Sequence, residues 1–132
     1  MRVFGHSMAP VLRPGQLVLI DQEAYRGRQP RRGEIVVARP SGLGGRAFVK
    51  RVVGLPREQV RLGARTWALG AEEFFLLGDQ QEQSMDSRIF GPVRLEELVG
   101  SVRARIWPWK RLTPTSSTAG EAVTRDIHLE SP

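Results

Sequence analysis

The chain has 132 residues, of which 40% are hydrophobic, so it is long enough to form one domain with its own core. It contains no cysteine and two histidines, which excludes a disulfide framework, a thiolate nucleophile and a cysteine-based metal site. We therefore expect neither a metal nor another cofactor. No apolar run approaches the roughly 18 residues of a membrane-spanning helix, and no signal peptide is visible.

Glycine and proline, with 14 and 9 residues, separate short runs of β-forming residues. The predicted strands, in chain order, are residues 16–21, 34–39, 46–53, 58–62, 66–69, 73–77 and 99–107. Gly63 lies between the fourth and fifth runs, which predicts a hairpin. Residues 92–99 are the predicted helix, because Pro92 begins them and Gly100 follows them. The sequence thus predicts a mostly β, antiparallel domain with one short helix.

The composition changes at Thr113, where a run of small polar residues begins and no apolar period follows. Such a segment buries too little apolar surface to fold by itself. We predict one domain over residues 1–112 and a disordered polar tail over residues 113–132.

The net charge is +6, and 18 of the 20 basic residues are arginine. A genome that favours arginine codons explains this ratio, but a lysine can lose its proton when buried and an arginine cannot. Lys50 shares one face of its predicted strand with Phe48 and Val52. If that face is buried, the pKa of Lys50 falls toward neutrality, where a neutral amine can accept a proton. The alternative is a half-exposed lysine that reaches water.

Two further segments carry polar side chains, a serine hydroxyl and two carboxylates, that could form a site together with such an amine. Ser7 lies between Gly5 and Pro10, where a tight turn can present its hydroxyl and its own N–H to one point, as acyl transfer requires. The second segment follows an apolar run that ends at Gly78, and it contains Asp79 and Asp86. An ordinary turn serine and a solvated loop are the alternatives for these two segments.

In their order and spacing, these segments resemble the bacterial signal peptidase I family of serine–lysine proteases. Residues 5–12 look like the nucleophile box, 32–37 like a Gly-Asp-Ile-Val strand, and 49–56 like the box with the general base. Residues 75–91 look like the last box of the family. The resemblance covers residues 3–109 and implies the β fold of signal peptidases, which SOS-repressor cleavage domains share.

The resemblance implies a role for each matching residue. Ser7 would be the nucleophile and Lys50 the general base, and Ser84 would orient the amine of Lys50. The Ser7 N–H would form part of the oxyanion hole; Gly5 stands where many relatives have a hydroxyl-bearing second donor. Two structural ion pairs are implied as well, Asp79 with Arg51 and Asp86 with Arg88. Small apolar pockets for Ala-like residues before the cut would be lined by Val3, Phe4, Met8, Leu12, Phe48 and Val49.

Departures from the family pattern are Val11, Gln16 and Gln80, none of which removes a catalytic atom. Family members usually carry a membrane anchor before the nucleophile, whereas six residues precede Ser7 here. We therefore expect a trimmed core or a compact member without its own anchor. The resemblance implies the outer face of the cytoplasmic membrane, and a peripheral or cytoplasmic location stays open.

The leading functional hypothesis is an endopeptidase that removes signal or leader peptides from precursor proteins near a membrane surface, with a separate anchor subunit as a candidate partner. A narrower version trims the leader of one client, such as a nickel-type superoxide dismutase. A second class is a non-catalytic or nucleic-acid-binding module of the same fold, to which the basic loop with Arg26, Arg28, Arg31 and Arg32 would contribute. We do not expect nucleic acid, because the arginines form no single stripe.

Overall fold

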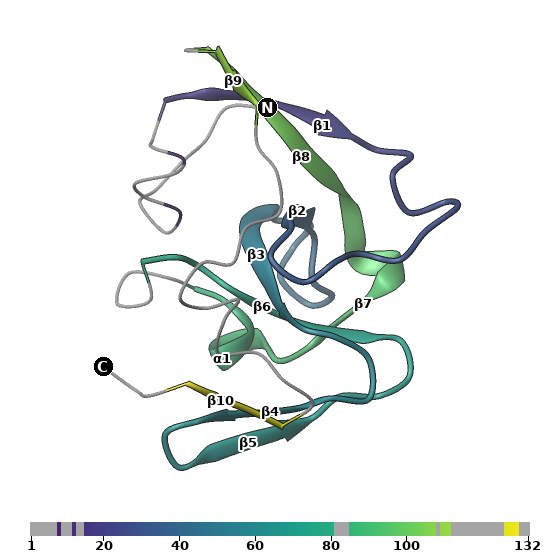
Figure 1. Ribbon diagram of the computed structural model, residues 1–132, viewed down its shortest axis with the longest axis vertical. Coiled ribbons are helices and arrows are strands. Elements are labelled where there is room, and N and C mark those ends of the chain that lie inside the picture. Colours follow the sequence, from purple (N-terminus) through teal and green to yellow (C-terminus); the bar gives the residue numbers. More distant parts are fainter. Residues whose placement is uncertain are drawn as a thin grey trace.

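The computed structural model describes Met8, Leu12 and residues 15–80, 85–107, 109–111 and 126–129, and from residue 104 onward it describes the backbone alone. The elements are drawn in Figure 1. The strands are β1 (Leu17–Asp21), β2 (Ile35–Ala38), β3 (Phe48–Gly54), β4 (Gln59–Leu62), β5 (Arg65–Ala68), β6 (Glu73–Leu77), β7 (Val93–Arg94), β8 (Leu98–Trp107), β9 (Trp109–Arg111) and β10 (Asp126–Leu129). The helical elements are α1 (Ser87–Phe90) and the 3₁₀ turn η2 (Leu95–Glu97).

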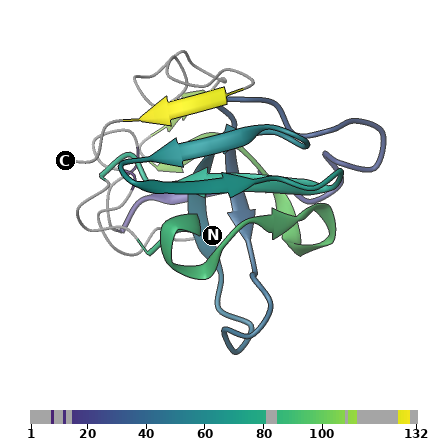
Figure 2. The ribbon, with the colours of Figure 1, turned by 90° about the horizontal axis from the view of Figure 1, so that it is seen from below.

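Most of the described strands form one antiparallel sheet in the order β1-β8-β2-β3-β6-β7, with β9 paired to β8. A smaller sheet in the order β10-β4-β5 contains the β4–β5 hairpin, and its three strands lie side by side in Figure 2. This architecture confirms the predicted mostly β, antiparallel class with one short α-helix. The predicted hairpin around Gly63 is also confirmed, and the predicted strands agree with the structure to within about two residues at each end.

Strand β3 lies between β2 and β6 and is covered on both of its faces. Val52 and its neighbour Val53 are fully buried, although they point to opposite faces and belong to two different core clusters. Strand β3 ends at Gly54, where a Cβ atom would come within 2.8 Å of the Phe75 Cβ on β6. A side chain at this position would push β3 and β6 apart, so glycine permits their close approach.

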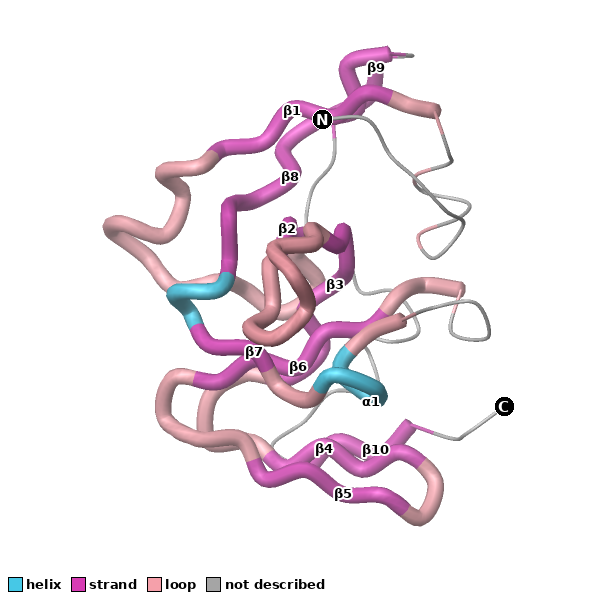
Figure 3. The backbone as a smooth tube through the Cα atoms, turned by 180° about the vertical axis from the view of Figure 1, so that it is seen from behind, coloured by secondary structure: helices cyan, strands magenta, loops and turns pink. Residues whose placement is uncertain are grey.

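The helix predicted at residues 92–99 is wrong. Instead, Val93 pairs with Phe74 of β6, η2 follows as a single turn, and β8 begins at Leu98. The Pro and Gly boundary signals were local, whereas the burial of Val93 against the sheet is a long-range gain that outweighs helix propensity. The α-helix of the described residues is α1, which lies beside β6 in Figure 3.

Within the stretch predicted to be a disordered tail, residues 126–129 form β10. This strand pairs in parallel with β4, and the register places Asp126 opposite Gln59. The rest of that stretch, residues 113–125 and 130–132, lies outside the described residues. The boundary near residue 112 therefore stays a prediction.

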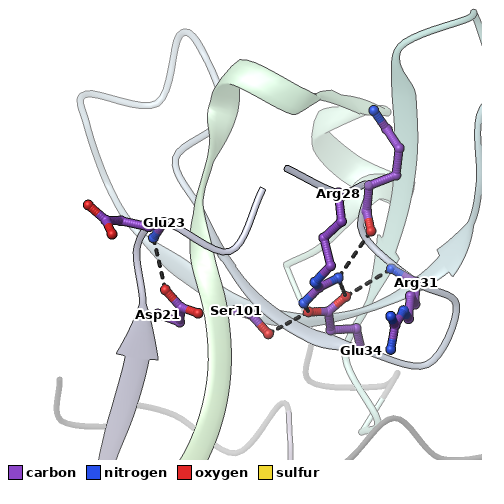
Figure 4. Close-up of polar contacts among 7 residues, drawn as sticks. Asp21, Glu23, Arg28, Arg31, Glu34 and Ser101 are labelled. Carbon is purple, nitrogen blue, oxygen red and sulfur yellow. Dashed lines mark hydrogen bonds and ion pairs between the residues drawn. The ribbon is translucent and has the colours of Figure 1, made fainter. Parts of the chain in front are cut away.

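Two arginines of the basic loop are used internally. Arg28 donates to both carboxylate oxygens of buried Glu34, at 3.1 and 2.7 Å, and Ser101 and the Arg31 N–H donate to the same carboxylate (Figure 4). Arg32 likewise forms an ion pair with Glu58. These charges stabilise the loop that leads into β2, so the loop presents fewer free cations to an anionic partner than its sequence indicates.

The Glu34 cluster predicts a pH-dependent contribution to stability. Burial alone would raise the pKa of Glu34, but hydrogen bonds from Arg28, Ser101 and the Arg31 N–H outweigh burial and lower the pKa to about 2. The contribution, about 3 kcal/mol, is present above the ordinary pKa of 4.5 and is lost as the pH falls toward 2. Urea unfolding of Glu34→Gln at pH 7 should show a loss of this order, and the difference from wild type should shrink at pH 3.

The control is Glu96→Gln, because Glu96 forms an exposed ion pair with Arg94 at 3.2 Å. Such a pair contributes about 1 kcal/mol or less. Equal losses in the two variants at pH 7 would contradict a special role for the buried carboxylate.

Candidate functional site

Lys50 is buried on the central strand of the main sheet. It pairs with Val36 of β2, and its side chain is 3% exposed. Phe48 and Val52, on the same face of β3, are also buried, and the Phe48 ring centroid lies 5.8 Å from the Lys50 Nζ. The period-2 alternation of β3 therefore brings an amine into largely apolar surroundings, rather than leaving it half exposed.

Burial is the main reason that the pKa of Lys50 falls from 10.5 to about 8, because the ammonium form loses its hydration. The carboxylate of Asp86 opposes this effect, while the cations of Arg88 and Arg46 add to it. A pKa near 8 leaves a substantial fraction of neutral amine close to physiological pH. Lys50 can therefore act as a proton acceptor without an adjacent histidine.

Asp86 organises the chain beside Lys50. Its side chain is fully buried and caps α1 by accepting the Arg88 N–H at 3.1 Å. It also accepts the Gly78 N–H at 3.2 Å, and the Arg88 side chain donates to it at 2.9 and 3.0 Å. One carboxylate thus joins the end of β6 to the start of α1 and is charge-balanced by Arg88.

Arg51 performs a similar task on the opposite face of β3. Its guanidinium donates to both Asp79 oxygens at 2.9 and 2.8 Å and to the Gly33 carbonyl at 2.7 Å. Arg51 is 2% exposed, so these are buried, charge-assisted contacts that fix geometry. The segment between Asp79 and Asp86 is therefore anchored at both ends.

Ser87 is a positioning residue that the sequence analysis did not select. It is fully buried, and its Oγ accepts the Leu76 N–H of β6 at 2.9 Å. The sequence signal for Ser87 is a serine directly after a capping aspartate. The same pattern occurs at many helix starts whose serine contacts no other element, so it does not single out Ser87.

The residues expected to line substrate pockets are distributed as follows. Met8 and Leu12 are 1% and 0% exposed and belong to a core cluster with Val18 and Ile35, against which Val49 packs. Phe48 lies on the other face of β3 and contacts Phe90 at 5.5 Å between ring centroids. The remaining expected site residues lie outside the described residues; they are Val3, Phe4, Gly5, Ser7 and Ser84.

A family model described as "Signal peptidase, peptidase S26" matches residues 1–66 and 61–107. The chain belongs to this family. A protein of Synechocystis sp. named "Probable signal peptidase I-2" is 31% identical over 134 residues, covering 80% of this chain and 62% of the relative. The chain thus spans less than two thirds of that relative's length.

Two other members of the signal peptidase family give a similar result. "Signal peptidase I" of Bacillus caldolyticus is 29% identical over 83% of this chain and 79% of its own length. "Mitochondrial ATP-independent inner membrane protease subunit 1b" of Arabidopsis thaliana is 32% identical over 87% of this chain and 73% of its own length.

The described residues of this family member include neither a membrane-spanning helix nor a metal-binding cluster. None of the helices in that part of the chain has the length and apolar character to cross a membrane. The same residues contain no cluster of three or more His, Cys, Asp and Glu side chains that could hold a metal ion.

The burial of Lys50 predicts a stability difference with a definite sign. The folded-state pKa is lower than the ordinary value, so folding is penalised when Lys50 is protonated in both states, and stability rises with pH between the two pKa values. The penalty is roughly 3 kcal/mol below pH 8 and disappears as the pH rises toward 10.5. Lys50→Met should therefore unfold at a higher urea concentration than wild type at pH 7, and this advantage should shrink as the pH rises toward 10.5.

Arg103→Met is the control, since Arg103 is an exposed residue of β8. Its difference from wild type should not depend on pH in this range. A Lys50→Met variant that is less stable than wild type at pH 7 would contradict a destabilised ammonium.

Proposed function

We propose that the chain is a serine endopeptidase that removes signal or leader peptides by a Ser/Lys mechanism, with Ser7 as nucleophile and Lys50 as general base. The observation that carries the proposal is the buried Lys50 amine, whose pKa is lowered to about 8. A lysine in this state has little structural use, because its burial costs stability, whereas a general base needs this proton affinity.

In the proposed reaction, the neutral Lys50 amine takes the proton of the Ser7 hydroxyl as Oγ attacks the scissile carbonyl. The Ser7 N–H donates to the developing oxyanion. Gly5 has no side-chain hydroxyl that could serve as the second donor, so a backbone N–H or water takes that place. The Lys50 ammonium then protonates the leaving amine, and the acyl-enzyme is hydrolysed by water that Lys50 activates in turn. Ser84 orients the amine throughout.

Two packing features support this arrangement. Met8 directly follows Ser7 in the chain and is buried in the cluster against which Val49, the neighbour of Lys50, packs. Ser84 belongs to the segment whose ends are fixed by the Arg51–Asp79 and Arg88–Asp86 pairs. These two features support the proposal that Ser7 and Ser84 act together with Lys50.

The proposed substrates are precursor proteins with small residues before the cut, which the pocket-lining residues named above would accept. Curated relatives named as signal peptidases, and others named as subunits of a mitochondrial inner membrane protease, support a membrane-associated substrate and a separate partner subunit. We also propose that the peptidase domain spans residues 1–112 with a polar tail after it, and that the enzyme works at the outer face of the cytoplasmic membrane.

The test is cleavage of a presecretory peptide with an Ala-x-Ala site in detergent, with the cut position read by mass. Wild type should cut after the second alanine. Ser7→Ala removes the nucleophile and Lys50→Arg keeps the charge but cannot act as a base, so both should lose at least about a thousandfold in kcat/KM.

The matched control is Lys110→Arg, which changes the other lysine of the chain and should leave the activity unchanged. A peptide cut equally well by Lys50→Arg and wild type would disprove the mechanism. Cleavage of one leader-bearing metalloenzyme precursor alone, with no cut in the general peptide, would support the dedicated maturation protease in its place.

A further inference from the structure

A row of two cations and an aromatic ring leads from the protein surface to the Lys50 amine. Arg46, Phe48 and Lys50 are spaced two residues apart, so they share one face of β3 and its N-terminal extension. Arg46 is exposed, whereas Phe48 and Lys50 are buried. The Arg46 guanidinium carbon lies 4.9 Å from the Phe48 ring centroid, and the Lys50 Nζ lies 5.8 Å from the same centroid.

The Phe48 ring is held from a second direction. The Phe90 ring, on α1, contacts it at 5.5 Å between centroids with a 37° tilt. An aromatic ring fixed in this way is a platform on which a guanidinium stacks favourably. In this stacked position the Arg46 guanidinium carbon lies within about 11 Å of the Lys50 Nζ, since the two distances to the centroid add to no more than that.

Most other charges around Lys50 are neutralised in pairs. On the α1 side, the Asp86 carboxylate is bound to Arg88. Glu34, which directly precedes β2, is bound to Arg28. Asp79, which follows Gly78 after the end of β6, is bound to Arg51. Within the part of the chain that the structure describes, Arg46 forms no ion pair. Its positive charge is thus uncompensated there and acts on the amine.

We propose that Arg46 is a positioning residue that further lowers the proton affinity of the buried Lys50: its cation, stacked on Phe48, disfavours a second cation on the other side of the ring. Removal of a unit charge at this distance should raise the pKa of Lys50 by roughly 0.3 to 0.6, given a dielectric constant between about 40 and 80. The catalytic meaning of this control depends on the proposed function, but the proton affinity itself does not.

The decisive measurement is therefore a titration that needs no activity. The chain contains two lysines, so isotope labelling of lysine gives two side-chain NMR signals, and Lys50→Arg identifies the one from Lys50. Arg46→Gln should raise the pKa of Lys50 by the amount above. Arg46→Lys keeps the charge and should leave that pKa near its wild-type value. Arg103→Gln removes an exposed charge on β8 and should also leave it unchanged.

Salt provides a second, independent measurement on wild type and Arg46→Gln. Because Arg46 is exposed, its effect is screened as the ionic strength rises, so 1 M NaCl should raise the pKa of Lys50 in wild type more than in Arg46→Gln. An unchanged pKa in Arg46→Gln, or an equal salt response in both proteins, would overturn the proposal.

Peptide cleavage then separates this inference from the proposed function. If both hold, the acidic limb of kcat/KM against pH should move upward in Arg46→Gln by the NMR shift, while the maximum rate at high pH is retained. A shifted NMR titration in a protein that cleaves no peptide would support the Arg46 inference and contradict the proposed function. A displaced kinetic limb without the NMR shift would overturn the Arg46 inference alone.

Discussion

The burial of one amine on the central strand is the constraint on which the site depends. A charged lysine in apolar surroundings is unfavourable, and burial lowers the pKa of Lys50 although the Asp86 carboxylate opposes this effect. The Asp86 carboxylate is matched by Arg88, and Asp79 is matched by Arg51. Because each carboxylate already has a cation, neither pair adds a strong net negative field that would restore the proton of the amine.

The sequence alone predicts the strands well, because period-2 alternation and Gly/Pro boundaries are local signals. It also predicts that Lys50 is chemically special, since a lysine is rare in an arginine-rich chain. It fails at residues 92–99, where Pro92 and Gly100 imitate helix boundaries although Val93 gains more by pairing with Phe74 of β6. Local propensity cannot reveal which competing long-range contact is available.

Other features that the sequence did not predict also depend on contacts between distant parts of the chain. Arg32 of the basic loop pairs with Glu58, 26 positions further along the chain, and a local run of arginines does not reveal such a partner. Likewise, the stacking of Arg46 on Phe48 depends on Phe90 holding the ring from another element. The resemblance to a family identified the ion-pair residues, but Ser7 and Ser84 lie outside the described residues, and their roles stay proposals.

Strand β3 carries two cations at adjacent positions, and they face opposite sides of the sheet. Lys50 can release its proton and Arg51 cannot. If β3 paired with β2 one residue out of register, a permanent guanidinium would enter the apolar site and the titratable amine would face Asp79. Such a misfolded sheet would keep its composition and most of its backbone hydrogen bonds, yet it would lack the base that the proposed mechanism needs. In this protein, the accuracy of strand pairing during folding is therefore itself a condition for chemistry.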